Sequence, residues 1–165
     1  MLQKKICMLG SFAVGKTSLV RRYVESIYSD VYHTTVGVKI DKKTVNVKQQ
    51  EVNLVLWDLY GEDDFQKMRW SYVRGSSGYL LVADGTRRAT LEKALALEEG
   101  VRKEVGSLPF ILVLNKADLS PTWEVDSGTE NQLAEKGWDV LRASAKTGEN
   151  VEAAFQKLTQ KMLGA

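Results

Sequence analysis

Short runs of apolar residues alternate with amphipathic stretches along most of this chain. Five continuous runs predict strands that are buried on both faces, at residues 5–9, 52–57, 79–83, 110–114 and 139–143. Helical patterns separate most of them: residues 18–25 suit one helix, Thr90 is a candidate N-cap of a second, and Asn150 of a third. This alternation predicts a three-layer α/β sandwich with a mostly parallel sheet.

The second and third of these helices each carry an apolar stripe at helical spacing, and we expect both stripes to face the core. In the second helix, which Gly106 and Pro109 should end, the stripe is Leu91, Ala94, Leu95, Val101 and Val105. In the third helix it is Val151, Ala154, Phe155, Leu158 and Met162.

Residues 39–48 break the alternation of strand and helix. They are rich in lysine, and only three residues separate them from the run at 52–57, which leaves no room for a crossover helix. The two segments should therefore form an antiparallel hairpin, with 39–48 as a sixth strand at the sheet edge. Lysines suit such an edge because charge blocks pairing with other chains.

Composition fits one domain, and we expect residues 1–165 to form it. The chain has 165 residues, of which 44% are hydrophobic and 27% charged, and its formal net charge is +2. That balance gives no reason to expect nucleic-acid binding. There is one cysteine, no secretory or lipidation signal and no apolar stretch of transmembrane length. We therefore expect a cytoplasmic monomer without a direct membrane anchor of its own.

Between the first strand and the first helix stands a phosphate-binding signature. Residues 10–17 read G-x-x-x-x-G-K-T, from Gly10 to Thr17. Successive N–H groups of such a loop cradle a pyrophosphate at the positive end of the following helix. Lys16 would reach the β- and γ-phosphates, and the Thr17 hydroxyl would hold Mg²⁺.

Three further motifs follow predicted strands, so all should meet at the carboxyl edge of the sheet. They are Asp58-Leu-Tyr-Gly61, Asn115-Lys-Ala-Asp118 and Ser144-Ala-Lys146. A stretch of little periodicity, residues 28–37, precedes the edge strand and is predicted to be a loop; it contains Thr35 and the only histidine, His33.

With these motifs in this order, the chain resembles a small GTPase of the Ras superfamily, closest in pattern to the Rab-like branch. The resemblance covers essentially all 165 residues, and it implies the P-loop NTPase fold of a small G domain. The phosphate loop alone would also suit many ATPases and kinases. The N-K-x-D and S-A-K motifs are far more specific and argue against an adenine nucleotide.

The resemblance implies a role for each base-contacting residue. Asp118 would accept hydrogen bonds from N1–H and the exocyclic amine of guanine, a donor pair that adenine lacks. Asn115 would brace the loop, the Lys116 stem and Tyr28 would cover the base, and the Ala145 N–H would meet the guanine oxygen. The full set of implied nucleotide contacts is Phe12, Ala13, Val14, Gly15, Lys16, Thr17, Ser18, Tyr28, Thr35, Gly61, Asn115, Lys116, Asp118, Leu119, Ser144, Ala145 and Lys146.

The same resemblance implies a magnesium site and a switch. Thr17, Thr35 and Asp58 would hold Mg²⁺, Asp58 through water. The Gly61 N–H would bond the γ-phosphate, so two loops, at about 28–38 and 58–72, would relax once that phosphate leaves. Effector and regulatory proteins would dock on these loops. For catalysis, the resemblance points to Lys16, Thr35, Gly61 and the residue after it, Glu62.

Two residues depart from the family pattern. Glu62 stands where most members have glutamine; a carboxylate only accepts hydrogen bonds and would lie near the γ-phosphate charge, so we expect slow hydrolysis unless Glu62 acts as a base. Phe12 replaces a small residue of the phosphate loop. Its ring either crowds the space where a partner's arginine finger inserts or turns outward under the neighbouring loop.

The region after Gly61 leaves two further questions open. Arg69 is either an internal arginine finger or an ordinary surface residue. The aromatic residues Tyr60, Phe65, Trp70 and Tyr72 either form a partner-docking surface or pack among themselves and on the next helix. The leading hypothesis is a GTP/GDP switch with slow hydrolysis; the alternative is a GTP-binding interaction module that does not hydrolyse.

Overall fold

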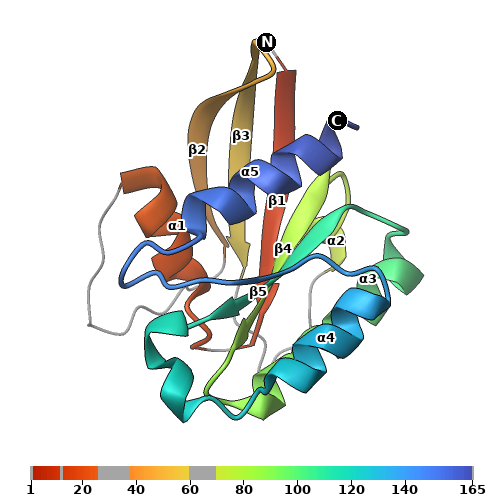
Figure 1. Cartoon of the computed structure of the whole chain (residues 1–165). Coiled ribbons are helices and arrows are strands. Elements are labelled where there is room, and N and C mark those ends of the chain that lie inside the picture. The colour runs from red at the N-terminus through yellow and green to blue at the C-terminus, as the bar shows by residue number, and fades with distance from the viewer. Residues whose placement is uncertain (1, 12, 26–37, 60–69, 165) are drawn as a thin grey trace.

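The computed structural model describes residues 2–11, 13–25, 38–59 and 70–164. Its sheet has six strands in the order β2-β3-β1-β4-β5-β6 (Figure 1). Every neighbouring pair is parallel except β2 and β3. The strands are β1 Leu2–Gly10, β2 Val38–Val47, β3 Gln50–Leu59, β4 Gly78–Asp84, β5 Phe110–Asn115 and β6 Val140–Arg142. The predicted mostly parallel sheet with one antiparallel edge is confirmed.

Helices cover both faces of the sheet. They are α1 Lys16–Glu25, α2 Trp70–Val73, α3 Arg88–Glu104, α4 Ser127–Glu135 and α5 Val151–Met162, with a 3-10 helix, η1, at Ala117–Thr122. The sequence pattern missed α2, η1 and α4. The α4 segment carries one buried residue, Leu133, so it has no apolar stripe to detect.

The core divides into two clusters because successive strand residues point to opposite faces. In β1, Ile6 and Met8 join the cluster under α1 and α5, whereas Cys7 and Leu9 join the cluster under α3. The central strands β1, β4 and β5 contribute to both clusters. This burial on two sides explains why their sequences are continuous apolar runs rather than alternating ones.

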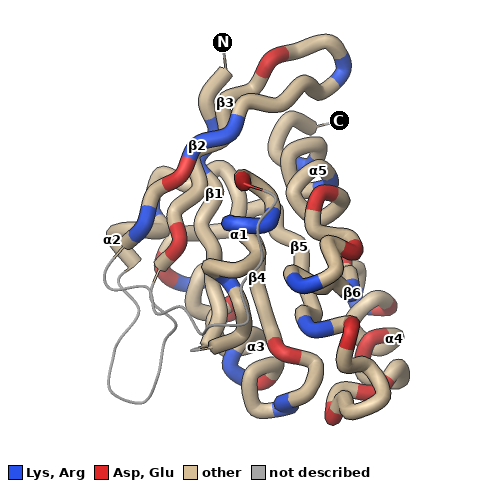
Figure 2. Tube along the Cα trace, turned by 90° about the vertical axis from the view of Figure 1, so that its left-hand side faces the viewer, with Lys and Arg blue, Asp and Glu red and all other residues tan. Residues whose placement is uncertain are grey.

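Strands β2 and β3 form the predicted hairpin. Their register runs from Val38 opposite Leu59 to Val47 opposite Gln50, so Lys48 and Gln49 alone make the turn. Both turn residues have positive φ, 50° and 64°. Basic residues recur along β2, the edge strand (Figure 2), as expected for a strand protected from stray pairing.

Of the two predicted helix caps, Thr90 is wrong, and Asn150 is confirmed in position but not as a hydrogen-bonding cap. Helix α3 begins at Arg88, three residues before the expected start at Leu91, and Arg87 is its N-cap residue. Thr90 is buried, and its hydroxyl accepts a hydrogen bond from the Asp84 N–H at 2.8 Å. A buried hydroxyl needs such a partner, so Thr90 joins α3 to the end of β4 instead of capping.

Asn150 does stand at the N-cap position of α5, but its side chain makes no cap hydrogen bond. Its amide donates to the Arg142 carbonyl at 2.8 Å instead. The apolar stripe predicted for α3 differs in part from the buried face. Leu95, which the prediction included, is only half-buried, whereas Leu97, which it left out, is buried.

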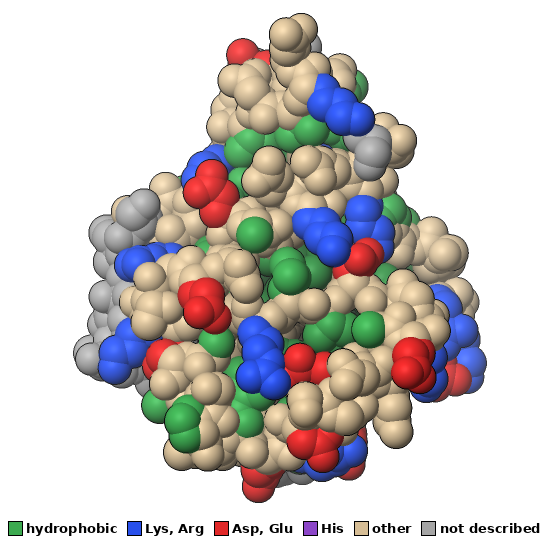
Figure 3. Space-filling view, viewed as in Figure 1, with side chains coloured by type: hydrophobic (Ala, Val, Ile, Leu, Met, Phe, Trp, Pro, Cys, Tyr) green, Lys and Arg blue, Asp and Glu red, His purple; other side chains and the backbone are tan. Residues whose placement is uncertain are grey.

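On the face that carries α5, acidic and basic side chains are interspersed, and the apolar ones lie in small separate groups (Figure 3).

None of the helices in the described parts of the chain combines the length and hydropathy needed to span a bilayer.

Candidate functional site

The carboxyl ends of the parallel strands gather the predicted motifs at one edge of the sheet. The phosphate loop leaves β1 there, and two of its glycines are required by close approach. A Cβ at Gly10 would overlap the Val82 carbonyl, and one at Gly15 would overlap the Asn115 amide. Gly15 also has a φ of 100°, in the region that side chains disfavour.

Lys16 lies beneath this loop and is almost fully buried, with 5% of its surface exposed. Its ammonium donates to the carbonyls of Gly10, at 3.2 Å, and Ser11, at 3.3 Å. Burial lowers the pKa of Lys16 to about 8, although the nearby Asp58 carboxylate opposes this by raising it. The positive charge is thus held inside the loop, where phosphate groups would compensate it.

Thr17 and Asp58 meet beside Lys16. The Thr17 hydroxyl donates a hydrogen bond to Asp58 Oδ2, which joins the start of α1 to the end of β3. Mg²⁺ prefers oxygen ligands and is commonly held by one or two carboxylates together with substrate phosphates. This pair fits that chemistry. Among the described residues no group of three or more His, Cys, Asp or Glu side chains could bind a metal without such help.

Asn115, the first residue of the N-K-x-D motif, joins the phosphate loop to the S-A-K motif. Its amide donates to the Val14 carbonyl at 2.8 Å, and its carbonyl oxygen accepts a long bond, 3.4 Å, from the Ala145 N–H. The side chain is buried, with 3% exposed. The predicted bracing role matches this geometry. The Ala145 N–H, expected to meet the base, faces Asn115 here.

Asp118 stands at the start of η1 and accepts a hydrogen bond from Ser144 Oγ at 2.7 Å. Ser144 is fully buried, so in this structure it orients the carboxylate and is not itself open to a ligand. A cavity of about 210 Å³ adjoins this carboxylate. It is lined by Gly15, Ser18, Asn115, Lys116, Asp118, Leu119, Ala145 and Lys146, all of them predicted nucleotide contacts.

Asp84, at the end of β4, belongs to the same site but was not predicted. Its carboxylate is fully buried and lies 2.7 Å from the Lys116 ammonium and 3.0 Å from Arg87 Nε. Burial alone would raise the pKa of Asp84, but hydrogen bonds from Lys116, Thr86 and Arg87 bring it below its usual value. The strand-end rule that selected Asp58 and Asn115 would also have selected Asp84.

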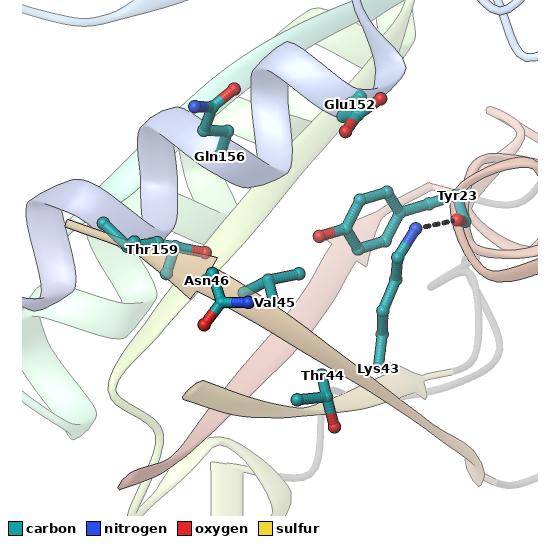
Figure 4. Close-up of a pocket in the computed structure, with 9 residues that line it drawn as sticks. Tyr23, Lys43, Thr44, Val45, Asn46, Glu152, Gln156 and Thr159 are labelled. Carbon is teal, nitrogen blue, oxygen red and sulfur yellow. Dashed lines mark hydrogen bonds between the residues drawn. The ribbon is translucent and has the colours of Figure 1, made fainter. Parts of the chain in front are cut away.

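Two hollows larger than this cavity lie between α1, β2 and α5, with volumes of about 300 Å³ and 380 Å³. In the first, Lys43 runs beneath the ring of Tyr23 (Figure 4). Its ammonium donates to the Tyr23 carbonyl at 2.6 Å and lies 3.9 Å from the ring centroid. This cation is already engaged in holding β2 on α1, and no predicted site residue lines either hollow. Chemistry, rather than size, selects the cavity at Asp118.

Comparison with known proteins places the chain in a family. A model of the Ras family matches residues 5–164. The chain belongs to the Ras family. It is 32% identical over 161 residues to the Ras-related protein Rab-2B of Dictyostelium discoideum, an alignment that covers 96% of this chain and 80% of that protein.

Membership of the Ras family makes this protein a GTP-binding switch GTPase of the Rab-like kind. Ras-family GTPases bind GTP and GDP, typically with Mg²⁺, and work through effectors and regulators. The order of strands around the phosphate loop is the small G-domain arrangement of the P-loop fold.

Several predicted residues of this Ras-family site lie outside the described ranges. They are Phe12, Tyr28, Thr35, Gly61 and Glu62, together with His33, Tyr60, Phe65 and Arg69. The described aromatic residues beyond them pack inward. Trp70 fills the space over Gly100 of α3, and Tyr72 lies 6.1 Å from the Trp57 ring. For these two residues, packing on the neighbouring helix and strand is the alternative that the structure supports.

Proposed function

We propose that this protein is a guanine-nucleotide switch in which Asp118 reads the base, Lys16 and the loop around Gly15 hold the phosphates, and Thr17 and Asp58 bind Mg²⁺. The observation that carries the proposal is the cavity at Asp118. Its carboxylate is oriented by Ser144, and its walls come from η1, the phosphate loop with the start of α1, and the loop after β6. Gly15, one of the lining residues, directly precedes the buried Lys16.

Base selection follows from the chemistry of the carboxylate. An ionised Asp118 only accepts hydrogen bonds, so it favours a base edge with two adjacent donors, as guanine has. Adenine would leave the carboxylate desolvated without donors, a loss that rejects an analogue by orders of magnitude. Asn115 contributes by tying this corner to the phosphate loop, so base and phosphates are held at one spacing.

We assign phosphate binding to hydrogen-bond donors of the phosphate loop and to Lys16. The Lys16 ammonium supplies a positive charge whose burial strengthens its electrostatic effect. Mg²⁺, when bound by Thr17 and Asp58 with Thr35, would neutralise phosphate charge during hydrolysis. We propose that the loops at about 28–38 and 58–72 respond to the γ-phosphate and signal to effector and regulatory proteins, with residues 1–165 acting as one G domain. We also propose that it works as a cytoplasmic monomer.

We propose further that intrinsic hydrolysis is slow because Glu62 replaces the usual glutamine and Phe12 adds a ring to the phosphate loop. A glutamine amide both donates and accepts, whereas an ionised carboxylate repels the charged phosphoryl group. The double change Glu62→Gln with Phe12→Gly is expected to raise the single-turnover rate of phosphate release by at least about tenfold.

The measurement uses protein stripped of nucleotide and loaded with radiolabelled GTP, and Arg69→Ala is tested alongside it. A double variant that is unchanged or slower would mean that the protein hydrolyses GTP by a different route, and a slower Arg69→Ala variant would identify that route. No turnover in any variant, with or without cell extract, would favour the non-hydrolysing interaction module. Equal binding of ADP and GDP would contradict the proposed base site itself.

A further inference from the structure

Trp123 directly follows η1. It contacts the turn at Lys116, which leads into the 3-10 helix that carries Asp118, but it does not line the cavity. Its indole N–H donates to the Lys116 carbonyl at 2.8 Å. Its ring occupies the space over Gly85, where a Cβ would overlap the indole. The Arg142 guanidinium lies 4.7 Å from the ring centroid and is ion-paired with Glu130. The half-buried indole is thus held from several sides.

The residue that Trp123 contacts has an uncommon backbone. Lys116 has a φ of 72°, a left-handed conformation that costs a non-glycine residue about 1–2 kcal/mol. Its carbonyl accepts two hydrogen bonds, one from the Leu119 N–H at 2.9 Å and one from the Trp123 indole. Such a conformation persists only where the surroundings hold it. Trp123 is one of those restraints.

The Lys116 turn sets the direction of two side chains at the site. It aims the Lys116 ammonium at Asp84, 2.7 Å away, and it starts the 3-10 helix whose second residue is Asp118. Ser144 fixes the Asp118 carboxylate from one side. The backbone of the turn is held separately, because the Lys116 carbonyl accepts the hydrogen bond from the Trp123 indole.

We propose that Trp123 is a positioning residue for guanine recognition: through its hydrogen bond to Lys116 and its packing on Gly85, it holds the turn that presents Asp118 to the base. The inference rests on the proposed role of Asp118. The contact also explains the glycine at position 85, which is buried directly after Asp84 and leaves room for the indole.

The test compares the binding of GDP with that of inosine diphosphate. Inosine diphosphate lacks the exocyclic amine from which Asp118 would accept a hydrogen bond. In Trp123→Phe an aromatic ring remains, but the N–H donor is lost. We expect GDP affinity to fall about fivefold and the preference for GDP over inosine diphosphate to fall about threefold or more, as for loss of one hydrogen bond. Gly85→Ala displaces the indole and should have the same effect. Since both changes act through one contact, the double variant should lose no more affinity and preference than the worse of the two single variants.

Trp138→Phe is the matched control, because the Trp138 ring packs edge-on against Phe110, at a centroid distance of 5.0 Å, and lies outside the cavity. It should leave the preference unchanged. Melting temperatures measured with GDP establish that each variant is folded. If Trp123→Phe does not fold, the test is made with Gly85→Ala by itself. An unchanged preference in a folded Trp123→Phe or Gly85→Ala protein would overturn the inference. Equal binding of the two nucleotides by the wild-type chain would instead overturn the role of Asp118.

Discussion

The protonation of individual side chains at this site depends on the groups that surround and bury them. Lys16 is the clearest case: 5% of the residue's surface is exposed, and among the described residues its ammonium donates to the Gly10 and Ser11 carbonyls and lies near the Asp58 carboxylate. Burial disfavours the charged form, so the pKa of Lys16 falls to about 8 despite the raising effect of Asp58. Bound phosphate would favour the charged form and raise that pKa again. Nucleotide binding and Lys16 protonation are therefore linked.

The linkage predicts how GDP affinity depends on pH. Below about pH 8 the free protein already carries the Lys16 proton, so affinity is at its full value. Above that, binding must take up a proton, and the dissociation constant should rise by up to about tenfold per pH unit. We expect isothermal titrations from about pH 7 to about pH 9.5 to show this rise.

Lys16→Arg is the control, because arginine keeps its charge over this range. Titration of the guanine base affects both proteins equally, so the ratio of their dissociation constants isolates the lysine. A ratio that is constant with pH would contradict the linkage.

At the scale of elements, the β2–β3 hairpin combines a favourable register with an unfavourable turn. Ten paired positions place β2 against β3, and the two-residue turn brings both Lys48 and Gln49 to positive φ. A two-residue hairpin turn of type I′ requires this conformation, and Asn-Gly is the preferred sequence. Lysine and glutamine adopt it at a cost that pairing along the strands must offset.

Replacing the turn by Lys48→Asn with Gln49→Gly should therefore stabilise the fold. We expect a gain of about 1 kcal/mol in the free energy of unfolding, and a melting temperature higher by roughly 2–4 °C for a domain of this size. Circular dichroism melts of the GDP-bound protein measure it. The pair Lys48→Ala with Gln49→Ala removes the same side chains without easing the backbone, and it should give no gain. Equal gains in both pairs would point to the lost side chains instead.

At the scale of the whole molecule, the site exists only when the sheet is complete. Its residues lie at or just after the carboxyl ends of β1, β3, β4, β5 and β6, and Asn115 joins the phosphate loop to the segment after β6. The unfolded chain has no such cavity. A ligand that binds only the folded state stabilises it in proportion to the logarithm of its concentration over the dissociation constant.

Stripped protein should therefore melt at a markedly higher temperature with GDP and Mg²⁺ than without. At a thousandfold excess over the dissociation constant the gain is about 4 kcal/mol, or roughly 8–16 °C for a domain of this size. ADP with Mg²⁺ should produce no shift, and a chelator should reverse most of the GDP effect. Thermal denaturation followed by tryptophan fluorescence measures all three. An ADP shift as large as the GDP shift would contradict guanine selection.

The sequence by itself determined which apolar runs are strands, the antiparallel edge and the motifs at the strand ends, because hydrophobic period and signature spacing are local properties. It did not reveal that Thr90 binds Asp84 rather than capping α3, that Asp84 holds Lys116, or that Trp123 stands behind the Lys116 turn. Each of these contacts joins residues from different elements, or depends on a backbone conformation that its neighbours impose. Only the packed tertiary structure decides them, since burial obliges polar groups to find whichever partners the fold has brought within reach.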